Sequence, residues 1–318
     1  MTRANHLFLG LAAVLAAMLF GRLLPSWTLS LATVAASYAL VALGIVVLAR
    51  TGAVSFGQGL FYAVGGYAVA LIANEWGVTD ALAQVVVGAA FAAVAGALLG
   101  PLLARYSGIF FGMLTLALSM VLYGALLKSA ALGGSDGFNV GRPTLFGHVF
   151  TDSREADYML YAVSVLVTGL AGVAAAALFR SELGLMSLAV RDNALRVDYL
   201  GASPNRIITI NFVIAAACAG ASGALSLMAQ RHIDPQFAYW TTSGEFVFVA
   251  ILAGYRSVTA VFVAALILEL VRSFSGLWFA NTWQLVLGLF LLGVILFLPQ
   301  GIGSLWTRRR RRQAEAAP

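Results

Sequence analysis

The stretch LARTGAVSFGQGLFYAVGGYAVALIA, residues 48–73, is apolar enough to lie in a membrane, yet it contains five glycines. Arg50, Ser55 and Gln58 add polar groups to the same stretch. Glycine weakens an isolated helix, but in a bilayer it permits bends and lets helix backbones approach closely. The stretch is therefore predicted to be either a broken membrane segment or a tightly packed one, and both interpretations stay open.

The whole chain has the composition of an integral membrane protein. Its 318 residues are 61% hydrophobic and only 10% charged, with a mean hydropathy of +0.92. Apolar runs near the length of about 20 residues that a membrane helix needs recur along the chain. They lack the alternating pattern of a membrane β-barrel, so an all-α polytopic protein of about ten transmembrane helices is predicted. The runs lie approximately at residues 6–24, 29–49, 54–73, 81–104, 108–128, 158–179, 207–229, 243–254, 257–276 and 282–299.

Small residues and isolated functional groups carry little information about chemistry. Small side chains recur at helical spacing between Ala89 and Gly100, which indicates close helix packing and not a site. Cys218 is the single cysteine, and the three histidines are scattered, so no disulfide within the chain and no metal site is predicted.

The distribution of basic residues predicts the orientation. Five consecutive arginines, Arg308 to Arg312, favour the cytoplasmic side. With ten spans both termini are cytoplasmic, and thirteen of the nineteen basic residues then fall on the inside, while Arg272 counts to the outside. We therefore expect one transmembrane domain, residues 1–306, followed by a basic cytoplasmic tail, residues 307–318. No soluble basic surface with stacking aromatics is visible, so nucleic acid is not expected as a partner, whereas the lipid bilayer is.

Two long loops are predicted, an external one at residues 129–157 and a cytoplasmic one at residues 180–206. The cytoplasmic loop has apolar residues at steps of three and four with charges between them, which predicts one or two short amphipathic helices ended by a breaker at 201–204. Such a helix either lies on the membrane surface or docks into a groove of a partner protein. The apolar positions are Leu185, Leu188, Ala189, Leu195, Tyr199 and Leu200.

An ordered series of motifs resembles one known family. VRDNALRVDYLG at 190–201 resembles the cytoplasmic coupling loop of the inner-membrane permease subunits of the bacterial branched-chain amino acid type ABC importers. TGAVSFGQGLFYAVGGY at 51–67 resembles the early glycine-rich motif of this family, and SGEFVFVAILAG at 243–254 a later one. Similar segments occur at 105–119, 133–143 and 287–301, so the resemblance covers nearly the whole of residues 40–301.

The resemblance implies a permease subunit in the bacterial inner membrane that carries branched-chain or related amino acids. It implies a second homologous permease subunit, an external solute-binding protein and two ATPase subunits, which hydrolyse the ATP, while this chain binds no cofactor. It places the contact with the ATPase in the coupling loop. The residues expected there are Arg191, Asp192, Asn193, Leu195 and Gly201.

Three departures from the family pattern concern coupling and gating. Ala194 stands where an acidic residue is usual, and Arg196 with Val197 replaces a pair of small residues. After residue 253 a glycine-rich turn is usual, and Arg256 occupies one of its glycine positions. Their effect on docking and on the turn is left open.

The chain has no ATP-binding motif of its own. Lys128 is its single lysine, and it does not stand in the G-x-x-x-x-G-K-[ST] pattern that cradles phosphates. No spacing predicts a metal site or an activated nucleophile either. An enzyme is therefore not expected.

Uncharged polar groups are the better candidates for a translocation path. Ser55, Gln58 and Thr115 are expected either to line the path or to form hydrogen bonds between helices. Glu245 follows Thr242 at the spacing of a capping box, which accounts for it, while its match to the glutamate of the family motif implies a role near the outer gate as the alternative. Both readings of each residue stay open.

Acidic residues within the spans bear on the alternatives. Glu269 and Arg272 are three residues apart, which predicts a structural ion pair or, as an alternative, an ion pathway. No pair of embedded acids is expected, which disfavours a proton-coupled carrier. The alternative functions are a sugar or nucleoside-type ABC permease and, from another class, a stand-alone channel or secondary carrier.

Overall fold

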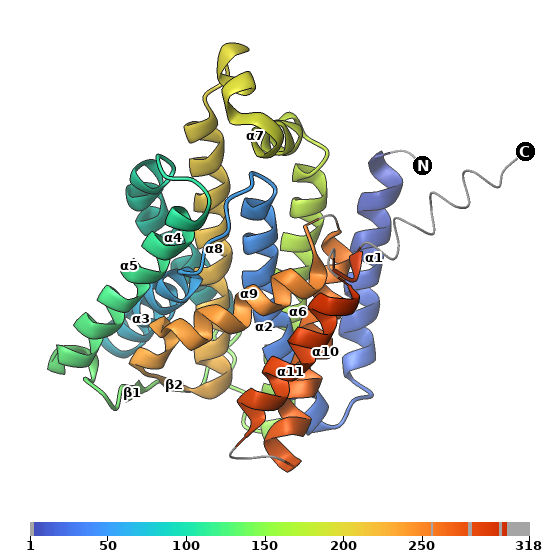
Figure 1. Cartoon of the computed structure of the whole chain (residues 1–318). Helices are drawn as coiled ribbons and strands as arrows, with labels where there is room; N and C mark the ends of the chain where they lie inside the picture. The colour runs from blue at the N-terminus through green and yellow to red at the C-terminus, as the bar shows by residue number, and fades with distance from the viewer. Residues whose placement is uncertain (1–2, 256, 279–281, 299–300, 304–318) are drawn as a thin grey trace, which may run out of the picture.

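The computed structural model describes residues 3–255, 257–278, 282–298 and 301–303, and most of them form helices (Figure 1). Short elements connect the helices, and the strands β1 and β2 pair antiparallel. The prediction of a helical, multi-pass protein is confirmed. The helices are α1 (Arg3–Gly21), α2 (Ser26–Ala49), α3 (Gln58–Trp76), α4 (Ala81–Leu103), α5 (Ile109–Lys128), α6 (Ser153–Leu178), α7 (Glu182–Tyr199), α8 (Pro204–Gln230), α9 (Trp240–Ala253), α10 (Val258–Trp278) and α11 (Trp283–Phe297). The short elements are η1 (Ala130–Leu132), β1 (Phe138–Asn139), β2 (His232–Ile233) and η2 (Pro235–Ala238).

Six of these helices are long and apolar enough to cross a membrane: α2, α4, α5, α6, α8 and α10. Each apolar run predicted from the sequence contains a helix, although some boundaries differ. The predicted external loop ends early because α6 begins at Ser153, where the Asp152 carboxylate accepts a hydrogen bond from the Arg154 N–H and caps the helix. The third run begins late because α3 starts only at Gln58.

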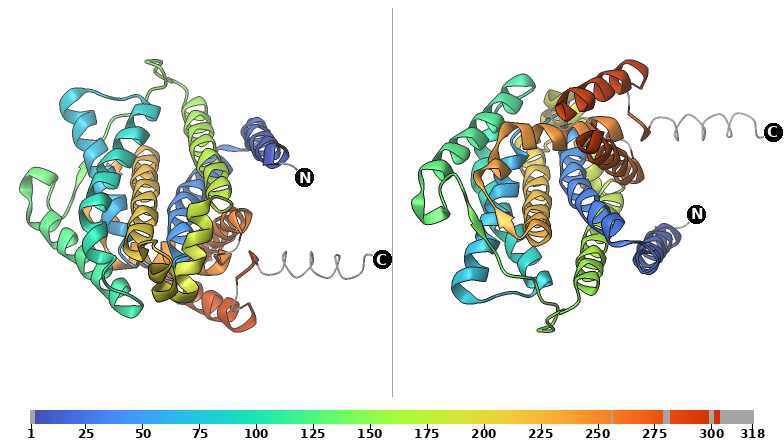
Figure 2. Two further views of the ribbon diagram at one scale, coloured as in Figure 1. Left: turned by 90° about the horizontal axis from the view of Figure 1, so that it is seen from above. Right: turned by 90° about the horizontal axis from the view of Figure 1, so that it is seen from below.

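Helices α2 and α8 form the centre of the bundle, and the other helices surround them (Figure 2). Small residues four apart on α4 face α8: Gly88, Ala92, Gly96 and Gly100 are all buried. A Cβ atom at Gly96 would lie 2.7 Å from the Ala216 Cβ, so glycine is required for this approach. The predicted packing role of these small residues is confirmed.

The glycine-rich stretch at residues 48–73 is both broken and tightly packed, in different halves. Residues 50–57 are not helical, and Gly52 turns the chain at a φ of 87° after α2. Farther on, a Cβ atom at Gly65 would overlap the backbone of Gly220 on α8. The two interpretations are therefore not alternatives, because the first half of the stretch bends and the second half packs.

Helix α7 lies beyond the ends of the neighbouring helices, at the same end of the bundle as the start of α1 (Figure 1). It consists of two short helices, because Asn193 has extended backbone angles (φ −161°, ψ 100°). The Asn193 Oδ1 accepts a hydrogen bond from the Arg196 N–H and caps the second one. The prediction of one or two helices ended near Gly201 is confirmed.

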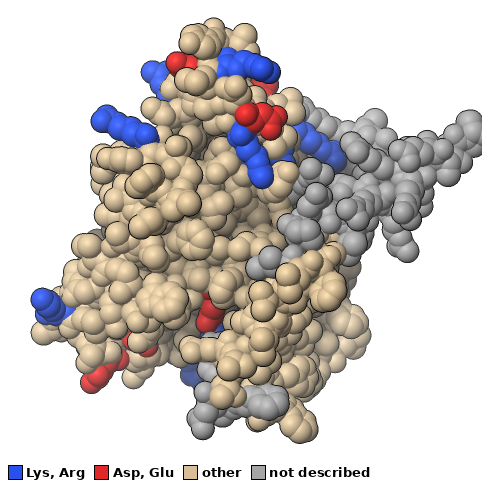
Figure 3. Space-filling model, in the orientation of Figure 1, with Lys and Arg blue, Asp and Glu red and all other residues tan. Residues whose placement is uncertain are grey.

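Charged side chains gather at the two ends of the molecule. In the face shown in Figure 3, Lys, Arg, Asp and Glu lie mainly at the α7 end and at the opposite end. A broad band between them is almost free of charge. This is the surface expected of a bundle that is embedded in a bilayer.

Candidate translocation path and coupling site

Ser55 and Thr115 lie together at the broken segment and satisfy its backbone. They are 0% and 2% exposed. The Thr115 Oγ1 accepts a hydrogen bond from the Phe56 N–H at 3.2 Å, and the Ser55 Oγ accepts one from the Gly57 N–H at 3.2 Å. Non-helical backbone at membrane depth needs such partners. Thr115 therefore connects α5 to the broken segment, whereas the Ser55 contact is local to that segment and does not join two helices.

Two further serines belong to this group, and the sequence analysis missed them. The Ser243 Oγ accepts a hydrogen bond from the Gly59 N–H at 2.9 Å, and the Ser119 hydroxyl donates to the Ala238 carbonyl at 2.8 Å. Ser119 follows Thr115 by four residues on α5, which is a sequence signal that both face one neighbour. The first contact holds the first turn of α3 against the start of α9, and the second holds α5 against η2.

Gln58 differs from the other polar residues of this region because its side-chain amide makes no hydrogen bond to the described part of the fold. It is 0% exposed, and in the described part of the chain neither its Nε2 nor its Oε1 has a hydrogen-bond partner. A buried amide usually finds partners for at least some of its two donors and its acceptor. Gln58 therefore stays a candidate for contact with a polar solute or water.

Glu245 lies apart from the other three candidates, and its capping-box interpretation is wrong. Helix α9 begins at Trp240, so Thr242 lies inside the helix, and its hydroxyl donates to the Gln236 carbonyl instead. The reason is the tight turn of η2, which starts α9 earlier than the sequence spacing indicated. The Glu245 carboxylate instead accepts a hydrogen bond from the Tyr38 hydroxyl at 3.2 Å.

Arg272 joins two acidic side chains within the bundle. It lies inside α10 and not in an outer loop, as the orientation count assumed. Its Nη1 is 3.3 Å from the Glu245 Oε2 and 3.9 Å from the Glu269 Oε2. The predicted Glu269–Arg272 pair is confirmed, but the expectation that no two embedded acids come together is wrong. The spacing along the chain does not show this contact, because tertiary packing makes it.

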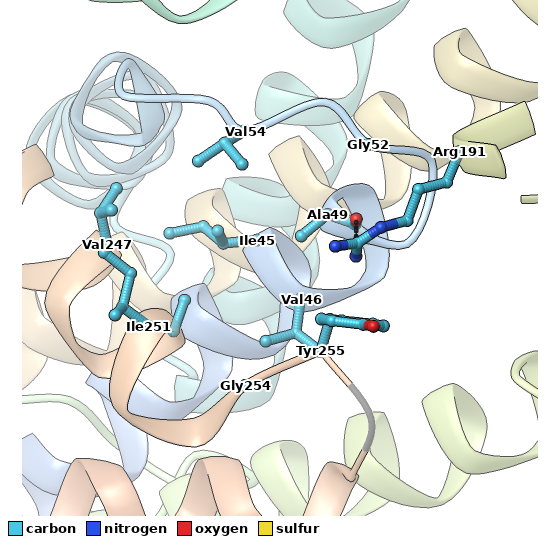
Figure 4. A pocket seen from close by; sticks show the side chains of 11 residues that line it. Ile45, Val46, Ala49, Gly52, Val54, Arg191, Val247, Ile251, Gly254 and Tyr255 are labelled. Atoms are coloured by element: carbon cyan, nitrogen blue, oxygen red, sulfur yellow. Dashed lines mark hydrogen bonds between the residues drawn. The ribbon is translucent and has the colours of Figure 1, made fainter. Parts of the chain in front are cut away.

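A pocket of about 430 Å³ opens between the ends of α2 and α9 and the side of α7 that faces the bundle (Figure 4). Its walls are mostly aliphatic, and the Arg191 guanidinium enters it from α7 (Figure 4). The residues around it are Ile45, Val46, Ala49, Gly52, Val54, Arg191, Val247, Ala250, Ile251, Gly254 and Tyr255.

Arg191 ties α7 to the bundle. Its Nη1 donates to the Ala49 carbonyl at 3.2 Å, and its guanidinium carbon lies 3.7 Å from the centre of the Tyr255 ring. Ala49 is the last residue of α2, where carbonyl groups lack helical partners and favour a cation. One side chain therefore contacts the end of α2 and the chain just after α9.

A second arginine at this end stays inside the fold. Arg50 is 7% exposed, and its guanidinium carbon lies 4.1 Å from the centre of the Phe179 ring. Burial lowers the pKa of Arg50 from its ordinary value, Tyr255 acts in the opposite direction, and Arg191 adds to the lowering. Two neighbouring cations thus share this junction of α2, α6 and α7.

The other predicted coupling residues divide into structural and exposed ones. Asn193 makes the bend of α7, and Gly201 turns the chain at a φ of 86°. Asp192 and Leu195 are exposed. Of the departures from the family pattern, Ala194 and Arg196 are exposed, whereas Val197 is buried with Val190 and Ile207 and packs α7 onto α8. Arg256 lies outside the described residues, as does the tail at 307–318.

These features define a class: a multi-pass helical membrane protein with a broken, buried polar segment inside and an amphipathic helix beyond one end. A family model described as "Branched-chain amino acid transport system / permease component" matches residues 27–298. The chain belongs to this family, whose members are transport permeases and not catalytic enzymes. It is a permease subunit of an ABC importer.

Curated relatives agree with this assignment. The chain is 29% identical over 301 residues to the high-affinity branched-chain amino acid transport system permease protein LivM of Escherichia coli, covering 86% of this chain and 69% of that protein. It is 30% identical over 327 residues to LivM of Salmonella typhimurium, covering 95% and 75%. It is 27% identical over 171 residues to the permease protein LivH of Escherichia coli, covering 52% and 55%. No solved structure matches.

Proposed function

We propose that this chain is one of two homologous permease subunits of a bacterial importer for branched-chain or related amino acids. An external binding protein delivers the solute, and two ATPase subunits hydrolyse ATP, so this chain binds no cofactor. The names of the relatives support the solute class. Similarity to both LivM and LivH supports a pair of permeases, since the two are differently named permease proteins of high-affinity branched-chain amino acid transport systems.

We also propose a placement in the inner membrane with ten crossing helices and both termini in the cytoplasm. Residues 1–306 then form one domain, and residues 307–318 form a cytoplasmic tail. The start of α1 and the whole of α7 lie at one end of the bundle, which agrees with a cytoplasmic N-terminus (Figure 1). The excess of arginine in the segments at this end supports the same orientation.

Helix α7 is the observation that carries the proposal. Its inner side is buried at Ser187, Val190 and Val197, while apolar side chains cover its outer side. Charged residues lie between these apolar ones, a mixture that suits a protein groove better than hydrocarbon. The exposed apolar side chains are Leu185 (60%), Leu195 (70%), Tyr199 (89%) and Leu200 (82%).

The path for the solute is proposed to follow α9. This helix has 14 residues and is about 21 Å long at 1.5 Å per residue, shorter than a hydrocarbon core of about 30 Å, so the chain on either side of it completes the crossing. Partly or fully exposed residues form a stripe along it, with Gly244, Phe248 and Ile251 on one side. The stripe begins near Glu245 and ends at the pocket beside Arg191. A short helix of this kind suits the border of an aqueous path.

Crosslinking tests the proposal directly. Cys218→Ala removes the single cysteine, and Leu195→Cys then places one thiol on the outer side of α7. In the importer assembled with its ATPases, a bifunctional thiol reagent is expected to join this position to an ATPase subunit. Val149→Cys is the matched control, because Val149 is 61% exposed and lies in the loop between α5 and α6, at the opposite end of the bundle from α7. A thiol at residue 195 that reacts only with lipid-anchored reagents would refute the coupling role.

A further inference from the structure

Tyr38, Glu245, Glu269 and Arg272 form one cluster within the bundle, called here the ion cluster. The Arg272 Nη1 donates to the Tyr38 hydroxyl oxygen, and the Tyr38 O–H donates to the Glu245 carboxylate at 3.2 Å. The two carboxylates lie 3.3 Å and 3.9 Å from the same Nη1. Three helices, α2, α9 and α10, therefore meet at one guanidinium.

The ion cluster lies deep in the bundle. Tyr38 stands about 18 Å along α2 at 1.5 Å per residue, near the middle of that 24-residue helix. Glu269 is likewise central in the 21 residues of α10. A charged side chain at this depth is costly to insert into a membrane. Groups kept at such a cost usually serve the passage of an ion or a polar solute.

The charges in the ion cluster do not balance. Among the described residues, Arg272 is the only cation within 4.0 Å of either carboxylate, so two acids share one base. Glu269 is 8% exposed, and its Oε2 is buried without a hydrogen-bond partner. A buried carboxylate oxygen in this state can accept a further donor that carries positive charge.

The ion cluster also reaches the surface of the isolated chain. The Arg272 side chain is 33% exposed, and those of Glu245 and Glu269 are 13% and 11% exposed. Hydrocarbon cannot solvate a guanidinium, so this opening faces water or the second permease. Gly244, which precedes Glu245 in the sequence, has no atom of the described residues within 4 Å of a Cβ built on it, so there is open space beside α9 at this level of the helix.

We propose that the ion cluster contacts the solute in transit and recognises the two charges of a zwitterionic amino acid. Glu269 and Glu245 accept the ammonium group, and the exposed side of Arg272 meets the carboxylate. This inference rests on the proposed function and assigns the residues that act in it. The contact is brief, because the Arg272–Glu245 pair re-forms when the solute leaves. Phe248 and Ile251, one and two turns farther along α9, offer an apolar surface to the aliphatic part.

The test uses the complete importer in proteoliposomes, with leucine as the probe. We expect Glu269→Gln to lower the rate of leucine uptake at least about tenfold, because the amide cannot neutralise the ammonium group. Assembly of the complex and the ATP hydrolysis stimulated by the binding protein are expected to persist. Glu75→Gln is the matched control, since Glu75 is exposed at the end of α3. Leucine uptake that is unchanged in Glu269→Gln would overturn the inference.

A second measurement tests the inference if the Glu269→Gln variant does not assemble into the importer. In a Cys218→Ala background, Gly244→Cys is expected to react with a water-soluble quaternary-ammonium thiol reagent, and leucine during turnover is expected to slow this reaction. No reaction, or a reaction that leucine does not slow while uptake proceeds, would overturn the inference. Failure of the proposed function can be distinguished from failure of this inference. If the proposed function is wrong, the wild-type importer takes up no leucine, and the reaction at residue 244 still reports whether water reaches the ion cluster.

Discussion

A substitution at Gln58 can test transport separately from stability, because its amide adds no hydrogen bond to the described part of the fold. Its amide is fully buried, yet it gains no hydrogen bond from the described part of the chain. An unsatisfied buried polar group costs about 1 to 3 kcal/mol. Gln84 is a useful contrast, because it is 3% exposed and its Nε2 donates to the Val78 carbonyl at 2.9 Å. Gln84 stabilises a turn, whereas the Gln58 amide is available to bind a solute in transit.

We expect Gln58→Met to leave the melting temperature of the purified importer unchanged or raise it, because an apolar side chain of similar length removes the unsatisfied amide. Leucine uptake per assembled complex is expected to fall severalfold. Gln84→Met is the matched control, expected to lose about 1 kcal/mol of stability with uptake per complex retained. Thermal unfolding and uptake are measured on the same preparations. Normal uptake in Gln58→Met would show that Gln58 serves packing alone.

Among the elements, α7 is unusual because it is attached to the bundle on one side and exposed on the other. Val190 and Val197 pack it against α8, and Arg191 contacts Ala49 and Tyr255. A hydrogen bond from a charged donor contributes about 1.5 to 3 kcal/mol, and a cation–π contact at an exposed site contributes about 0.5 to 1 kcal/mol. Helix α7 is thus fixed to α2 and to the end of α9 by one replaceable side chain.

We expect Arg191→Lys to uncouple ATP hydrolysis from transport, because lysine keeps the charge but loses the planar group that stacks on Tyr255. The number of solute molecules imported per ATP hydrolysed is expected to fall about tenfold, while hydrolysis continues. Tyr255→Phe is the control, since it keeps the aromatic face. Uptake and phosphate release are measured together in proteoliposomes. A ratio equal to that of the unmodified importer would argue against the attachment as a coupling element.

At the scale of the whole molecule, the two charged ends imply opposite sides of the membrane. Helix α7 marks one end, and the loop between α5 and α6, with its short β1 strand paired to β2, marks the other. Leu200 is 82% exposed at the first end. Gly141 lies in the loop and has open space around a Cβ atom. Cysteines at residues 141 and 200 can therefore report the orientation of the chain in the membrane without disturbing its packing.

We expect Gly141→Cys to be labelled by a membrane-impermeant thiol reagent in intact cells, in a Cys218→Ala background. Leu200→Cys is expected to react only after the cells are made permeable. Both variants are compared at equal expression, and reaction of both after permeabilisation is the control. Labelling of residue 200 in intact cells would reverse the proposed orientation.

Much of the fold follows from periodicity and composition, because an apolar run in a bilayer has helix as its main solution. The apolar runs, the two-part α7 and the packing of small residues on α4 were predictable for that reason. The start of α9 was not, since it depends on the turn at Pro235. The ion cluster was not either: Tyr38 and Arg272 are separated by 234 residues and meet only through packing. Ser119 and Ser243 were missed because a serine in an apolar helix gives no sign of which backbone it serves.

The unwound segment 50–57 connects the anchoring point of α7 to the first turn of α3. It begins beside Ala49, which Arg191 contacts, and it ends at Gln58. An unwound chain resists being stretched but folds under compression, so it acts as a tether and not as a rod. Movement of α7 away from the bundle would pull on Gln58, whereas movement toward the bundle would only slacken the chain. A signal passed along this segment would therefore have a direction, whereas a helix in its place would transmit movement of α7 both toward and away from the bundle.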